Sequence, residues 1–183
     1  MGYYYFDFKD IEKQGIRGLL TSILAQLCAR SDPCYQILSK LYSENNAGSQ
    51  QPENQALINC LKEIFRLSQR PIAYIIVDAL DECPNTSGFP TAREKVLDFL
   101  EELVNLNLPN LRICVTSRPE IDIQTVLEPL TSLQVSLHDE SGQKQDILDY
   151  IRTVVHSDRR MRRWRPEDMQ LVIDTLSAKA DGM

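Results

Sequence analysis

Residues 71–83 read Pro-Ile-Ala-Tyr-Ile-Ile-Val-Asp-Ala-Leu-Asp-Glu-Cys and place three carboxylates directly after the most apolar run of the chain. Residues 72–77 show no alternation of apolar and polar side chains, which is typical of a parallel strand covered on both faces. Pro71 ends the helical pattern before this run, because proline cannot continue a helix. Ligands of parallel α/β proteins bind at the carboxyl ends of the strands, so the stretch predicts a buried strand that ends in an acidic site.

The three acidic side chains are Asp78, Asp81 and Glu82. An aspartate at the end of a buried strand can hold a hydrated magnesium ion, and a second acid a few residues on can orient or deprotonate a water that attacks a phosphate. In the alternative interpretation, Asp78 begins a turn, and Asp81 and Glu82 are solvated charges of a loop. The rest of the chain favours the first interpretation.

The 183 residues are enough for one domain and the start of another. Their 20 Lys and Arg against 26 Asp and Glu give a net charge of −6, so nucleic acid is not an expected partner. The 5 cysteines form no C-x-x-C pair, and the 2 histidines have no cysteine nearby, so no zinc site is expected. No apolar run is long enough to span a membrane. These features predict a cytoplasmic protein with reduced cysteines and no membrane contact.

Alternating strand and helix patterns predict an α/β fold. Further strands are expected at residues 3–8 and 111–116, and a weaker one at residues 133–137. Four amphipathic helices are expected between the first three strands, at residues 15–28, 32–42, 53–69 and 91–106, the second with Asp32 as its N-cap.

We expect the strands to be parallel in the order 3–8, 72–77 and 111–116. Residues 133–137 should either pair with 111–116 or stand about two strand spacings from it, roughly 9 to 10 Å. Two helices and no strand follow, and the last helix should stop at Gly182. The sequence therefore predicts a domain of residues 1–137 and the start of a helical domain at residues 138–183.

Further blocks accompany the acidic one, at residues 5–8, 25–28, 115–120, 146–147 and 179–183. Together they resemble the NACHT domain of the STAND class of signalling NTPases, in the nephrocystin-like version found in large fungal receptors. The resemblance covers nearly the whole chain. Its most specific part is the acidic block, where the small residue Ala79 follows the aspartate that binds magnesium in that family.

The resemblance implies a three-layer P-loop NTPase core with ATP and magnesium as cofactors. Asp78 would bind magnesium through water, Glu82 would position or activate the attacking water, and Asp81, the second acid of the catalytic set, would support the loop. Arg118 would contact the terminal phosphate and report whether ATP or ADP is bound, because a guanidinium can form bidentate bonds to phosphate oxygens and lose them on hydrolysis. The alternative for Arg118 is a surface arginine before a proline.

The chain contains no G-x-x-x-x-G-K-[ST], and none of its 7 glycines precedes a lysine. In the family, this phosphate-binding loop lies before the strand with which this chain begins. We therefore expect a NACHT fragment that lacks its first strand, P-loop and P-loop helix, and that does not bind nucleotide by itself. The implied function is a nucleotide-dependent signalling switch of an intracellular receptor, with homotypic NACHT oligomerisation as the expected partnership.

Two other hypotheses stay open. The chain could be a catalytically empty interaction module that binds related NACHT proteins through its helices. Residues 158–165, with five arginines and Trp164, could also contact single-stranded nucleic acid by charge and stacking. A solvated connection between two helices is the simpler interpretation of this segment, given the net negative charge.

Overall fold

The computed structural model describes residues 1–45, 48–67, 72–86, 88–136 and 141–180. The chain forms two compact units, Met1–Thr131 and Ser132–Met183, which are described separately. The predicted domain boundary after Leu137, the helix stop at Pro71 and the end of the last helix at Gly182 fall outside the described residues.

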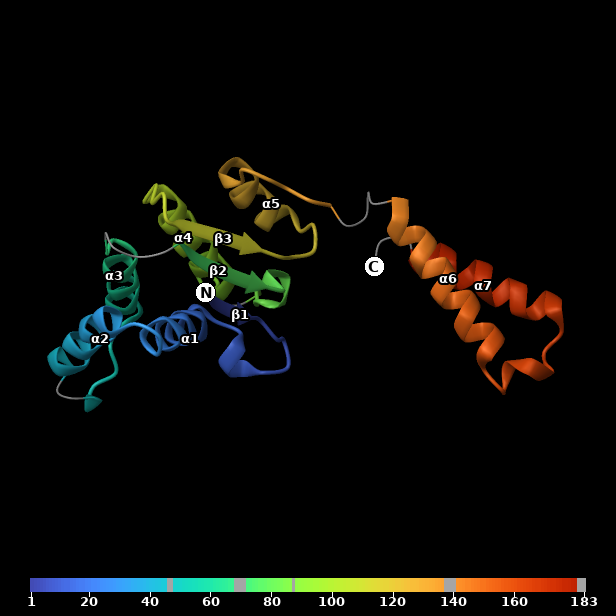
Figure 1. The fold of residues 1–183 in the computed structure, drawn as a ribbon, viewed down its shortest axis with the longest axis horizontal. Helices are drawn as coiled ribbons and strands as arrows, with labels where there is room; N and C mark the ends of the chain where they lie inside the picture. Colours follow the sequence, from blue (N-terminus) through green and yellow to red (C-terminus); the bar gives the residue numbers. More distant parts are fainter. Residues whose placement is uncertain (46–47, 68–71, 87, 137–140, 181–183) are drawn as a thin grey trace. The chain divides into compact units, whose positions relative to one another are not determined.

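The first unit is built around a small parallel sheet. Its strands are β1 (Gly2–Tyr5), β2 (Ala73–Asp78) and β3 (Leu111–Val115). They lie in the order β1-β2-β3 and are all parallel, as Figure 1 shows, which confirms the predicted strand order. The register pairs Tyr5 with Asp78 and Val77 with Val115, so the three strands end at the same edge.

Helices connect the strands at nearly the predicted positions. They are α1 (Ile16–Cys28), α2 (Asp32–Glu44), α3 (Asn54–Phe65) and α4 (Ala92–Asn105), and a further helix, α5 (Ile121–Leu127), follows β3. Thr91 and Glu94 form a capping box that fixes the start of α4. The predicted N-cap of α2 is wrong, because Ser31 holds that position and Asp32 is already helical. The short α5 was not predicted.

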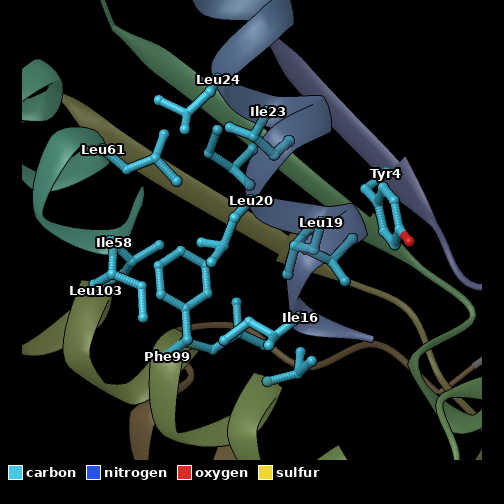
Figure 2. Close-up of a cluster of buried hydrophobic side chains, with 14 of the residues drawn as sticks. Tyr4, Ile16, Leu19, Leu20, Ile23, Leu24, Ile58, Leu61, Phe99 and Leu103 are labelled. Atoms are coloured by element: carbon cyan, nitrogen blue, oxygen red, sulfur yellow. The ribbon is translucent and has the colours of Figure 1, made fainter. Parts of the chain in front are cut away.

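One core fills the space between the sheet and the helices. Figure 2 shows its centre, where Leu20 of α1, Leu61 of α3 and Phe99 of α4 meet. All three side chains are buried, and α1 packs directly on β1. This burial fixes β1 and β2 beneath α1 and therefore positions the loops that follow both strands.

The opposite face of the sheet is open among the described residues. Tyr3, Tyr5 and Tyr74 project from it and are 55%, 46% and 50% exposed, whereas Ile75 and Val77 on the other face are buried. The prediction that residues 72–77 are covered on both faces is therefore wrong. The described part of this unit is an α/β fold of two layers rather than three, because α1, α3 and α4 share one core on one face of the sheet.

The prediction of a fourth strand is also wrong over the part of it that the structure describes. Residues 133–136 have no regular structure, and Leu133 and Val135 are 79% and 64% exposed. An alternating apolar pattern forms a strand only where another strand supplies hydrogen-bond partners, and β3 pairs only with β2 among the described residues. The last residue of the predicted strand, Leu137, lies outside the described residues.

The second unit is a pair of helices, α6 (Ser141–Ser157) and α7 (Pro166–Ala180), which pack on each other. Val155 and Ile173 are buried between them. Residues 158–165, which contain the five arginines, connect α6 to α7, as predicted. Within it Trp164 is 47% exposed, and the Arg165 Nε lies 3.1 Å from Asp168 Oδ2 of α7. No helix among the described residues is long and apolar enough to cross a membrane.

Candidate functional site

The carboxyl ends of β2 and β3 meet at one edge of the sheet, where Asp78 and Thr116 are the polar side chains. The Thr116 hydroxyl donates a hydrogen bond to Asp78 Oδ1 and accepts one from Ala79 N at 3.1 Å. Backbone bonds close the same edge, with Thr116 N to Val77 O at 2.9 Å and Leu80 N to Thr116 O at 3.0 Å. Asp78 itself is exposed, so its oriented carboxylate faces solvent.

Ala79 turns the chain out of the sheet and into the acidic loop. Its backbone has φ 54° and ψ 47°, in the left-handed region that a residue with a side chain seldom adopts. A 3₁₀ helix, η3 (Leu80–Glu82), follows, and its buried Leu80 anchors the loop in the core. Successive residues of a 3₁₀ helix are about 120° apart. Asp81 and Glu82 therefore contact different neighbours.

Glu82 contacts the loop that follows β1. Its Oε2 accepts a hydrogen bond from Phe8 N at 3.1 Å. Together with Asp78 and residues 5–9 it lines an open cavity of about 390 Å³. The structure therefore brings two of the predicted site residues, Asp78 and Glu82, to one cavity, and adds Asp7 and Lys9, which the sequence did not single out.

Asp81 contacts Arg118 instead. Its Oδ1 accepts a hydrogen bond from Arg118 N at 3.1 Å, and its Oδ2 lies 3.3 Å from Arg118 Nε. The side chain of Asp81 is only 11% exposed, whereas that of Arg118 is 81% exposed. Neither residue lines the cavity around Glu82. Asp81 therefore holds Arg118, whereas Asp78 and Glu82 line the cavity together with Asp7.

Arg93, in the first turn of α4, connects these parts and was not identified from the sequence. Its Nε donates to Cys83 O at 2.9 Å, and its Nη2 donates to Asp81 O at 2.6 Å. Its Nη1 forms ion pairs with Glu120 Oε2 and, at 3.1 Å, with Asp122 Oδ2. Burial by itself lowers the pKa of Arg93, but the hydrogen bonds to the two carboxylates outweigh it and leave the pKa raised. The guanidinium therefore stays charged in the interior.

The Cys83 thiol lies below the same loop. It is fully buried, and its Sγ donates to Gln14 O at 3.3 Å. Burial raises its pKa to about 11, although the nearby Arg93 acts in the opposite direction. A thiol with a raised pKa is a poor nucleophile at neutral pH. Cys83 is therefore a core residue and not a reactive group of the site.

The site fits a magnesium ion better than it fits a phosphate. Among the described residues, no three His, Cys, Asp or Glu side chains are grouped to enclose a metal. Magnesium bound to a nucleotide keeps several waters and needs one or two carboxylates, which the exposed Asp78 can supply. A phosphate cradle needs a glycine-rich loop of backbone amides followed by a lysine, and the 183 residues do not contain that motif.

Comparison with protein families identifies a family to which the chain is similar. The family model described as nephrocystin 3, N-terminal, matches residues 1–118. This range includes all four predicted site residues and ends on Arg118. No curated protein and no solved structure matches the chain.

Proposed function

Because the chain belongs to the nephrocystin 3 N-terminal family, we propose that it is part of a nucleotide-dependent signalling switch of the NACHT type, with ATP and magnesium as cofactors of the complete domain. The main support is the position of three side chains at the carboxyl ends of two adjacent parallel strands: Asp78 is the last residue of β2, Glu82 follows it, and Arg118 follows β3. This is the edge at which parallel α/β proteins bind their ligands.

In this proposal each side chain has a separate task. Asp78, oriented by the Thr116 hydroxyl, would hold magnesium through water. Glu82, fixed by the Phe8 amide, would orient the attacking water. Arg118 would contact the terminal phosphate, and its ion pair with Asp81 is the resting contact that it would leave. Magnesium, when bound, would neutralise charge on the phosphate oxygens.

The phosphate cradle would come from a P-loop outside these 183 residues, since they contain none. The chain by itself should therefore bind ATP–magnesium weakly or not at all, and calorimetric titration measures this directly. A micromolar dissociation constant would contradict the assignment of the cradle to another segment. We also propose that the protein acts in the cytoplasm and that it oligomerises through homotypic contacts with other NACHT domains.

A chimera tests the site roles. In it, the P-loop strand and helix of an intact NACHT protein precede Met1. Asp78→Asn should lose magnesium-dependent ATP affinity, whereas Glu82→Gln should bind ATP but not hydrolyse it. The exposed acids of α4 supply isosteric controls, Asp98→Asn and Glu101→Gln, which should leave both properties unchanged. Normal hydrolysis by both site variants would refute the roles.

The open face of the sheet favours a second candidate function, an interaction module that binds related NACHT proteins. The half-exposed Tyr3, Tyr5 and Tyr74 lie on this face of the sheet, not on the helices. In this case the chain should form a complex with an intact relative in analytical ultracentrifugation without nucleotide, and Tyr74→Lys should prevent it. A complex that forms only with ATP would favour the switch.

A further inference from the structure

Three of the contacts described above, together with one backbone hydrogen bond, close a ring around the acidic loop. Arg93 binds the backbone carbonyl of Asp81, and the carboxylate of Asp81 binds Arg118. Glu120 lies two residues after Arg118, and its carboxylate forms an ion pair with Arg93. The backbone joins Arg118 to Glu120, because Glu120 N donates to Arg118 O at 2.8 Å. The acidic loop and the segment after β3 therefore meet at one guanidinium.

The burial of the ring members differs in an informative way. The side chain of Arg93 is 6% exposed, whereas those of Glu120 and Asp122 are 42% and 35% exposed. A buried cation must be paired on all sides, so Arg93 holds the backbone carbonyls of Asp81 and Cys83 at fixed positions. The outer carboxylates remain open to water and can move with their segment. The fixed point of the ring is consequently Arg93 on the rigid helix α4.

We infer that Arg93 is a positioning residue that couples the acidic loop to the segment of Arg118. The inference deepens the proposed function and rests on it. If Arg118 moved from Asp81 to a phosphate, Asp81 would lose its ion pair, and the loop that ends in Glu82 would lose one of its contacts. A guanidinium suits this task because its planar fork presents five donors in fixed directions. A lysine at position 93 could keep the charge but could not bind two carbonyls and two carboxylates together.

Hydrogen exchange measured by mass spectrometry on the full chain tests the coupling without any nucleotide. Arg93→Met should speed exchange in peptides covering both residues 79–83 and residues 116–122 by about tenfold or more, because both segments lose a charge-assisted partner. Arg93→Lys should not restore the slow exchange of residues 79–83. The matched control, Lys95→Met, removes an exposed cation from the same helix and should change neither segment.

A second variant keeps the test decisive if Arg93→Met does not fold. Glu120→Gln changes a half-exposed carboxylate and should speed exchange in residues 116–122 alone, because Arg93 still holds the carbonyls of Asp81 and Cys83. Equal exchange in wild type and in every variant would overturn the coupling. So would faster exchange spread evenly over the first unit, which would mean a general loss of stability. Failure of ATP binding in the chimera would refute the proposed function and leave this result standing.

Discussion

A methyl group added at Gly18 should destabilise the protein, although the same change stabilises most helices. Gly18 lies inside α1, and a Cβ built there would be 2.4 Å from Glu12 O and 2.4 Å from the Tyr4 hydroxyl oxygen. A Cβ at Gly15, the N-cap of the same helix, would meet nothing within 4 Å. The two glycines therefore form a matched pair, one crowded and one open.

The magnitude follows from two opposing effects. Replacing Gly by Ala inside a helix gains about 0.5–1 kcal/mol from reduced backbone entropy. Overpacking typically costs about 1–3 kcal/mol, and the upper part of this range applies because Glu12 O is a backbone atom. The short helix η1 (Ile11–Lys13) must therefore move as well. We expect a net loss of about 1–2 kcal/mol and a Tm lower by roughly 2–8 °C.

Thermal and urea denaturation followed by circular dichroism measure this loss. Gly15→Ala should change stability by less than about 0.5 kcal/mol, because a poorer N-cap is offset by a stiffer unfolded chain. In a Tyr4→Phe background, Gly18→Ala should cost less, since one of the two clashing atoms is gone. A Gly18→Ala protein as stable as wild type would refute the close approach of α1 to Glu12 and Tyr4.

Three further experiments probe the core and the turn into the acidic loop. Burial raises the pKa of Cys60 to about 11 from 9.0, so the thiol stabilises the fold fully below pH 9 and progressively less as the pH rises toward 11. Cys60→Ala should therefore flatten the fall in unfolding free energy between pH 9 and 10, by up to about 1.4 kcal/mol per pH unit in urea titrations; an unchanged slope would contradict the burial. Of the 5 cysteines only Cys114 is exposed, so a thiol reagent such as DTNB should label one thiol rapidly and the other four on unfolding, and two rapid thiols would disagree with the fold. Ala79→Gly should leave stability unchanged or raise it, whereas Ala79→Val should lower it by about 1–2 kcal/mol, more than Ala25→Val on the exposed face of α1; equal losses for the two valine variants would argue against the left-handed backbone.

The parallel sheet and the acidic loop could be predicted because their signals are local. An apolar run followed by three acids defines a strand end, and amphipathic patterns define the helices that precede and follow it. Strand order followed from the resemblance to a known family. The open face could not be predicted in this way, since Tyr74 and Ile76 are apolar like the residues of a fully covered strand. Which face a helix covers depends on tertiary packing.

Arg93 illustrates a signal that was present but not used. It precedes Val96, Leu97 and Leu100 by three, four and seven residues, so it lies on the buried stripe of α4. A charged residue on such a stripe must have buried partners, and this alone could have marked it. The identity of the partners could not be read, because Glu120 and Asp122 lie beyond the next strand and nothing local connects them to α4.

The separation of roles between Asp81 and Glu82 depends on the conformation of the three residues in η3. In an extended loop, the side chains of two adjacent acids would point to opposite faces, about 180° apart. In a 3₁₀ turn they diverge by about 120°, so one contacts the segment after β3 and the other contacts the segment after β1. The acidic loop therefore binds both neighbours of the central strand, through Arg118 on one side and Phe8 on the other. A movement of Arg118 would act on Glu82 through the backbone of one short turn, and the left-handed Ala79 at its start is where that turn is joined to the sheet.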